Sequence, residues 1–102
     1  MRFDVYANPI IRTRATLPYV VQLQSDRAET GLDKVVAFLA LPTRFPQTEW
    51  LTPIVEIQGE RHVVLISSIT NLRSADLRIR IGNIAIHDEK ITRGLDWLLF
   101  GV

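Results

Sequence analysis

The stretch VVAFLAL at Val35–Leu41 is a continuous apolar run. Its length suits a strand that is buried on both faces, because a buried helix needs about ten residues or more. The run stops at Pro42, whose ring nitrogen cannot donate a backbone hydrogen bond to a sheet. We therefore predict that Val35–Leu41 is the central strand of a sheet.

Alternation of apolar and polar residues predicts further strands on both sides of this run. They lie at Arg2–Ala7, Tyr19–Gln24, Ile54–Ile57, His62–Ile66 and Leu77–Ile81. A short connection, Gln58-Gly59-Glu60-Arg61, joins two of them, and its glycine can take a positive φ. This connection predicts a β-hairpin.

Two segments have no apolar period. Pro42–Trp50 holds two prolines and is predicted to be a surface loop. Phe45 and Trp50 are large apolar groups to leave there, so they either pack back or meet a partner. The polar segment Ser67–Asp76 has no pattern that assigns it to a strand or a helix.

From Asp88 the period becomes helical. One stripe, about 100° wide, contains Ile84, Ile91, Leu95, Leu98, Leu99 and Val102. This stripe predicts a helix laid on the sheet, and the acidic residues Asp88 and Glu89 in its first turn favour the helix dipole. Gly94 lies in mid-helix at a cost of about 1 kcal/mol relative to Ala. Close approach by another backbone would account for it, and so would chance.

Two aromatic residues lie off this stripe. Phe100 is opposite the stripe and Trp97 is about 120° from its centre, on the side that should face water. We expect an oligomer or partner surface here. The alternative is a frayed tail that folds into the core.

Composition limits the class of protein. The chain has 102 residues, 47% of them hydrophobic, which suits one domain over residues 1–102. A net charge of +1 is far from the basic balance of a dedicated nucleic-acid binder. The absence of cysteine excludes a disulfide framework and a thiolate zinc site. No apolar run of about 18 residues and no signal core is present, so we expect a cytoplasmic protein without a membrane partner.

The residues that could carry catalysis are few. His62 and His87 have no partner at a diagnostic spacing, and no phosphate loop or metal motif is present, so we expect no enzyme, no metal and no cofactor. Arg73, Arg78 and Arg80 could line a nucleic-acid groove, but the exposed face of an ordinary strand looks the same.

Five stretches together resemble a known family. They are FDVYAN at Phe3–Asn8, YVVQLQSD at Tyr19–Asp26, VVAFLAL at Val35–Leu41, LTPIVEIQGE at Leu51–Glu60 and LLFGV at Leu98–Val102. In this order, and from end to end, the chain resembles the CcdB family of plasmid and chromosomal toxins. The resemblance implies a mainly β fold, an SH3-like barrel or antiparallel sheet with a single C-terminal α-helix, and a cytoplasmic homodimer.

The resemblance also implies a function without catalysis. Members of the family poison DNA gyrase: they bind its A subunit through the end of the C-terminal helix, across the dimer axis, and trap the enzyme with its DNA cut. A CcdA antitoxin neutralises the toxin with a disordered tail. The two proteins together repress their own operon, so operator DNA is an expected partner only through the antitoxin complex.

The family's contact residues carry over by position. Its ending, Trp-Gly-Ile, corresponds to Phe100, Gly101 and Val102, and Phe100 keeps an aromatic face but loses the indole N–H. A helix Asn corresponds to Asp96, a Phe to Leu99, and two isoleucines after the SD turn correspond to Arg27-Ala28. The resemblance thus implies gyrase contacts at Phe100, Gly101, Val102, Leu99, Asp96, Arg27 and Ala28. It places the dimer interface at Gly94, Trp97, Phe100 and Val102.

Three interpretations remain at this stage. The first is a gyrase poison that acts in plasmid maintenance or a related role. The second is a diverged member that binds antitoxin but no longer poisons gyrase, because Arg27, Ala28, Asp96 and Phe100 depart from the family pattern. The third is a MazF-like ribonuclease toxin, for which only Arg78, Arg80 and His62 could supply the chemistry.

Overall fold

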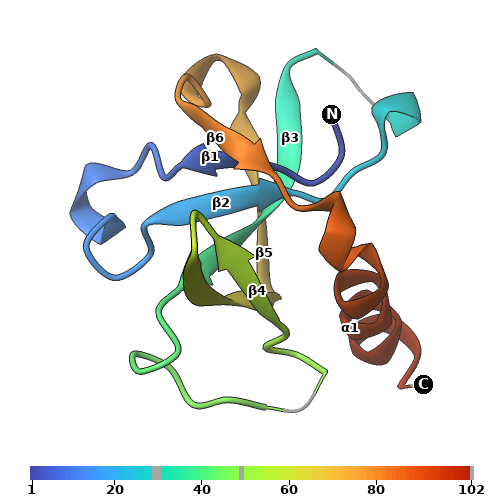
Figure 1. Ribbon diagram of the computed structural model, residues 1–102. Helices are drawn as coiled ribbons and strands as arrows, with labels where there is room; N and C mark the ends of the chain where they lie inside the picture. Colours follow the sequence, from blue (N-terminus) through green and yellow to red (C-terminus); the bar gives the residue numbers. More distant parts are fainter. Residues whose placement is uncertain (29–30, 49, 102) are drawn as a thin grey trace.

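In the part of the chain that the structure describes, six antiparallel strands form one sheet that curls into a nearly closed barrel, with a single helix at its side (Figure 1). The computed structural model describes residues 1–28, 31–48 and 50–101. The strands are β1 (Asp4–Ala7), β2 (Tyr19–Gln22), β3 (Asp33–Ala40), β4 (Ile54–Ile57), β5 (Glu60–Arg73) and β6 (Arg80–Asn83). The helix α1 spans Asp88–Phe100. Short 3-10 turns lie at Ile11–Thr13, Asp26–Ala28, Ser74–Asp76 and Ala85–His87. The predicted mainly β fold with one C-terminal helix is confirmed.

The predicted central strand is also confirmed. The sheet order is β4-β5-β3-β2-β1-β6, so β3 has a neighbour on each side. Val36, Ala37, Leu39 and Ala40 of β3 are fully buried. The strand ends at Ala40, two residues before Pro42, as expected for a residue that cannot join a ladder.

The predicted hairpin is a two-residue turn. Ile57 pairs with Glu60, so only Gln58 and Gly59 lie between β4 and β5. Both have positive φ, at 51° and 82°. This is the pattern of a type I′ turn, whose twist matches that of the flanking strands. Glu60 and Arg61 belong to β5 and not to the turn.

The unassigned polar segment Ser67–Asp76 continues β5 as far as Arg73 and then forms the 3-10 turn Ser74–Asp76. Residues 67–71 are all exposed, yet Ile69–Arg73 pairs with the first half of β3. The register shifts between Ala37 and Leu39, where β5 turns from β4 toward the far end of β3. Because neither face of this part of the strand is buried, its sequence carries no alternation.

The strand predicted at Leu77–Ile81 is wrong in position. Leu77 is buried and ends the 3-10 turn, and Ile79 is exposed. The strand that pairs with β1 is β6, which begins at Arg80. The first three residues of this alternation, residues 77–79, lie outside any strand, and only Arg80 and Ile81 belong to the ladder. The strands predicted at Arg2–Ala7 and Tyr19–Gln24 are each shorter, as β1 and β2.

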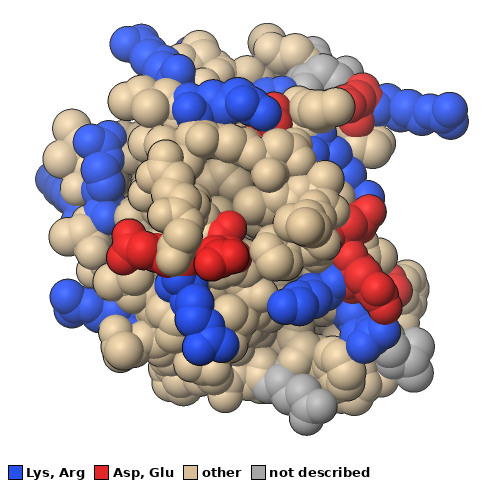
Figure 2. All heavy atoms as spheres, viewed as in Figure 1, with Lys and Arg blue, Asp and Glu red and all other residues tan. Residues whose placement is uncertain are grey.

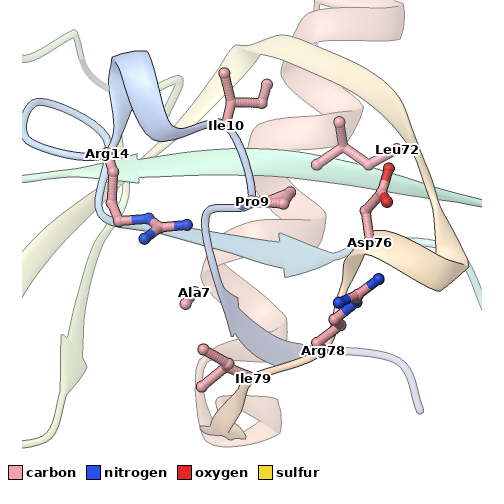
Figure 3. A pocket seen from close by; sticks show the side chains of 8 residues that line it. All are labelled: Ala7, Pro9, Ile10, Arg14, Leu72, Asp76, Arg78 and Ile79. Atoms are coloured by element: carbon pink, nitrogen blue, oxygen red, sulfur yellow. The ribbon is translucent and has the colours of Figure 1, made fainter.

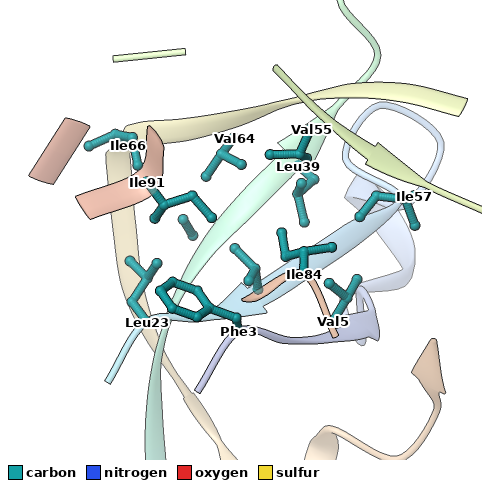
Figure 4. Close-up of a cluster of buried hydrophobic side chains, with 12 residues drawn as sticks. Phe3, Val5, Leu23, Leu39, Val55, Ile57, Val64, Ile66, Ile84 and Ile91 are labelled. Carbon is teal, nitrogen blue, oxygen red and sulfur yellow. The ribbon is translucent and has the colours of Figure 1, made fainter. Parts of the chain in front are cut away.

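The interior of the barrel is one apolar cluster (Figure 4). Its buried members are Phe3, Val5, Val21, Leu23, Ala37, Leu39, Val55, Ile57, Val64, Ile66, Ile84 and Ile91. A smaller cluster of Ala40, Val63 and Leu65 receives the half-buried Phe45 from the 41–53 loop. Of the two alternatives for Phe45, the structure supports packing back.

A buried carboxylate joins the two strands β1 and β6. Asp4 accepts hydrogen bonds from Asn83 Nδ2 at 2.9 Å, from Arg80 Nη2 at 3.1 Å and from the Met1 amine at 3.0 Å. Burial opposes ionisation, but the hydrogen bonds from Asn83, the amine and Arg80 outweigh it and lower the pKa of Asp4. The ionised carboxylate therefore stabilises the pairing of β1 with β6.

Candidate functional site

The helix α1 is held against the barrel by its first half. Ile91 is fully buried in the main cluster, and Leu95 packs against that cluster while half-buried. On the outer face Thr92 Oγ1 donates to Asp88 Oδ1 at 2.7 Å, and Arg93 pairs with Glu89 at 3.1 Å. The helix is thus anchored to the barrel on one side, and on the other side its own residues are linked by hydrogen bonds and an ion pair.

Gly94 is the point of closest approach between helix and barrel. A Cβ added there would lie 2.5 Å from the carbonyl oxygen of Trp50 and 3.0 Å from Cγ1 of Ile66. Close approach by another backbone is therefore the reason for a glycine in mid-helix. Gly94 is buried by its own chain, so it can influence a dimer only through the residues around it, and its predicted interface role stays a prediction.

The second half of α1 leaves the barrel and exposes its apolar side chains. The exposed fractions are 42% for Trp97, 40% for Leu98, 68% for Leu99 and 72% for Phe100. The exposed aromatics at Trp97 and Phe100 agree with the sequence pattern, and a tail folded into the core is contradicted. The prediction that Leu98 and Leu99 belong to the buried stripe is wrong, because after Leu95 no described residue of α1 belongs to a core cluster.

Gly101 ends the helix. Its φ of 74° is left-handed, and its N–H donates to the Trp97 carbonyl at 3.0 Å. This is the usual helix end at glycine, where a side chain would be strained. Phe100 is consequently the last residue of the helix. Val102, predicted in the stripe, the gyrase contact and the dimer interface, lies outside the described residues.

Trp50 lies beside this exposed end. Its ring centroid is 6.1 Å from that of Trp97, with the rings tilted by 42°, and the Arg93 guanidinium carbon lies 5.2 Å from the Trp50 centroid. Trp50 is half-buried and has a φ of 70°. Of the alternatives for this loop residue, packing back is therefore what the structure shows. The sequence contains no local signal that links Trp50 to the helix.

The other predicted contact residues divide into two groups. Asp96 is exposed on α1, one turn before Phe100. Arg27 and Ala28 form part of the Asp26–Ala28 turn and are exposed. Figure 1 shows this turn at the upper right, apart from the end of α1 at the lower right. One protomer therefore brings Asp96 to the exposed helix end and does not bring Arg27-Ala28 there.

The candidate ribonuclease residues are not gathered. His62 is 2% exposed; its Nδ1 lies 3.1 Å from the Glu60 carbonyl and its ring meets Tyr19 edge-on at 5.3 Å. Arg80 is bonded to Asp4. Within residues 1–28, 31–48 and 50–101, no contact joins His62 to Arg78 or Arg80, and no three metal-ligating side chains cluster. In that part of the chain, too, no helix has the length and apolarity needed to cross a bilayer.

His87 caps the free edge of β4. The Glu56 backbone N–H donates to His87 Nε2 at 3.4 Å, and Lys90 Nζ donates to the Ile54 carbonyl at 3.2 Å. Burial, with Lys90 nearby, lowers the pKa of His87 although Glu56 opposes the effect. A neutral imidazole is the form that can accept this bond. A groove of about 570 Å³ runs from here to Trp50.

A second hollow lies between the segments at residues 7–14 and 72–79 (Figure 3). It has a volume of about 400 Å³ and is lined by Ala7, Pro9, Ile10, Arg14, Leu72, Asp76, Arg78 and Ile79. The Nε groups of Arg14 and Arg78 donate to the backbone carbonyls of Asn8 and Ala75. Figure 2 shows basic and acidic side chains interspersed on the face in view, without a continuous basic groove. Arg80 is paired with Asp4, so its guanidinium is not free to join Arg73 and Arg78 in a cationic surface.

Comparison with known proteins connects these features to one family. No curated protein matches the sequence at a significant level. The family model for CcdB protein matches residues 2–101, which covers the barrel and the helix α1 up to its glycine cap. Because this match covers nearly the whole chain, it leads to one conclusion: the chain belongs to the CcdB family, as a CcdB-like toxin.

Proposed function

We propose that this toxin binds the A subunit of bacterial DNA gyrase through the exposed end of α1 and traps the enzyme with its DNA cut. The observation that carries the proposal is the run of large apolar side chains from Trp97 to Phe100, each at least 40% exposed. Contiguous exposed apolar residues mark binding surfaces, because leaving them in water is unfavourable. Family membership supplies the target.

The proposed mechanism is capture of one conformation. The toxin has no bond to make or break; it stabilises the cleaved state of gyrase only if it binds that state more tightly than the intact one. A helix suits this task, because a backbone that is already ordered loses less freedom on binding than a flexible segment does. The left-handed cap at Gly101 ends the helix, so that Phe100 is its last residue.

We propose that the same surface also forms a homodimer. Two copies that meet near Trp97, Gly94 and Phe100, with Val102, would place two helix ends side by side, so that both contact a twofold target across the dimer axis. Leu99 and Asp96 complete the proposed gyrase contact on α1. Arg27-Ala28 would contact gyrase at a separate point, since it lies away from the helix end within one protomer.

The proposed partners are therefore the gyrase A subunit, a second copy of the chain and a CcdA-like antitoxin in the bacterial cytoplasm. The antitoxin neutralises the toxin, and operator DNA is bound only through their complex. A second candidate, a family member that binds antitoxin without poisoning gyrase, is favoured by one observation: Asp96 places an exposed charge beside the apolar end of α1.

A cleavage assay separates the two candidates. Purified gyrase, DNA and ATP are incubated with the full chain and with a variant that lacks residues 100–102. Linear DNA trapped by the full chain alone supports the gyrase poison acting through the end of α1. A truncated protein that still traps cleaved DNA would contradict that mechanism. No trapping by a folded full chain that binds a CcdA-like antitoxin tightly supports the second candidate.

A further inference from the structure

The backbone of Trp50 is strained. Its φ of 70° lies in the left-handed region, which a bulky residue rarely adopts because its Cβ crowds the backbone. Such a conformation persists only where the surroundings hold it, and it is found preferentially at binding and switch regions. The contacts of Trp50 therefore indicate what holds it in this conformation and which part of the structure depends on it.

Three contacts hold Trp50 against α1. Its carbonyl oxygen points at Gly94, at a distance that leaves no room for a Cβ. Its ring packs against Trp97 and lies under the Arg93 guanidinium, an arrangement in which the cation is attracted to the ring face. The backbone and the side chain of Trp50 thus both contact the middle turn of α1, on the face formed by Arg93, Gly94 and Trp97.

The residues after Trp50 tie it to the sheet. The Leu51 carbonyl accepts from the Ile66 N–H at 3.1 Å, and the Pro53 carbonyl accepts from the Val64 N–H at 3.0 Å. These bonds extend the ladder of β4 and β5 up to the residue next to Trp50. A rigid connection therefore runs from the central part of β5, through Trp50, to α1.

C-terminal to these Trp50 contacts, no described residue of α1 is anchored to the barrel in a comparable way. Leu95 is half-buried, and every described residue after it, from Asp96 to Gly101, is exposed. An exposed helix end frays unless neighbouring contacts hold it. Trp97 is the member of this exposed segment that touches Trp50.

We propose that Trp50 is a positioning residue: it holds the second half of α1 in one orientation, so that Trp97, Leu99 and Phe100 face the target as a rigid unit. The inference deepens the proposed function and rests on it only for the identity of the target. Pre-organisation of this kind strengthens binding, because the helix end is already ordered before the target arrives.

The test compares three variants of the full chain. Trp50→Ala removes the ring, and Trp50→Phe restores an aromatic face. Phe45→Ala is the matched control, because Phe45 lies in the same loop but packs on Ala40, Val63 and Leu65, away from α1. Should Trp50→Ala fail to fold, Trp50→Gly removes the ring and adopts the positive φ at no steric cost.

The first readout is amide hydrogen exchange at residues 97–101, relative to the exchange of core amides in the same sample. Trp50→Ala is expected to speed this exchange by about tenfold, because the local opening of α1 no longer breaks the Trp50 contacts. Trp50→Phe should restore most of the protection, and Phe45→Ala should leave it unchanged. Equal acceleration in Trp50→Ala and Phe45→Ala would overturn the positioning role.

The second readout is binding of the purified A subunit of gyrase, measured by titration. Trp50→Ala is expected to weaken binding by about tenfold, and Phe45→Ala by less than about twofold. A loosened helix that binds gyrase as tightly as the original chain would also overturn the inference. If the original chain itself does not bind gyrase, the proposed function fails, and the exchange experiment still decides what Trp50 does.

Discussion

Substitution of Gly94 by alanine tests the packing of α1 on the barrel. The added Cβ would lie 2.5 Å from the Trp50 carbonyl oxygen, a distance that real Cβ atoms essentially never show, and 3.0 Å from Ile66 Cγ1. The nearer neighbour is backbone, whose position is tied to β5 through Leu51. Because it cannot rotate away as a side chain could, either the helix or the loop must shift.

The expected magnitude follows from two opposing effects. Overpacking costs about 1–3 kcal/mol, and the upper end applies where backbone must move. Alanine regains about 1 kcal/mol of helix propensity relative to glycine. The net loss in the free energy of unfolding is therefore about 2 kcal/mol.

Urea denaturation at fixed protein concentration measures this loss, since a dimer's stability depends on concentration. With a slope of about 2 kcal/mol per molar urea, the midpoint should fall by about 1 M. Gly82→Ala is the matched control: Gly82 has no atom within 4 Å of an added Cβ and no positive φ, so its midpoint should hardly move. A Gly94→Ala protein that is as stable as the original would refute the reasoning.

Two further predictions concern pH. Hydrogen bonds outweigh burial and lower the pKa of Asp4 below its ordinary value of 3.8, so the ionised carboxylate contributes stability that is lost as the pH falls below about 4. Asp4→Asn should remove this loss of stability in acid, measured as the urea midpoint between about pH 2 and 6. A variant whose midpoint still falls with pH as in the original protein would contradict the assignment. Burial lowers the pKa of His87 below its ordinary value of 6.5, so the unfolded chain binds the proton at a higher pH than the folded chain, and stability should rise as the pH increases toward about 6.5 and level off above it. His87→Gln should flatten that rise when midpoints are compared at about pH 5 and 8, whereas an unchanged difference would show that His87 does not cause it.

Some elements could be predicted from sequence because their signals are local. The run at Val35–Leu41 predicts a strand inside the sheet that is buried on both faces, and β3 has a paired strand along each edge and buried residues at Val36, Ala37, Leu39 and Ala40. Gln58-Gly59 forms a tight turn because Gly tolerates a positive φ. The segment at residues 67–71 could not be predicted, because a strand exposed on both faces has no alternation to read. At Leu77–Ile81, in contrast, an alternation is present but does not mark a strand with one buried face, because Ile79 faces solvent.

The candidate site was predicted in part. The helical wheel alone indicated that Trp97 and Phe100 lie off the buried stripe, and both are exposed. The contact residues Asp96, Leu99 and Gly101 came from the family resemblance, and their roles stay predictions. Trp50 was recognised only as an apolar residue in a loop, since its partners Gly94, Arg93 and Trp97 are more than 40 positions away in the sequence.

The sequence by itself determined which segments become the central strand, the hairpin and the helix, because hydrophobic period and turn residues act over a few neighbouring positions. Only the tertiary structure decided how far the helix stays buried. Leu98 and Leu99 continue the apolar stripe of Ile91, yet they are exposed because α1 runs past the part of the barrel that could cover them. The packing of α1 on the barrel also brings the Trp50 carbonyl close to Gly94. A stripe shows which face of a helix can be buried, and the sheet beneath it determines where burial ends.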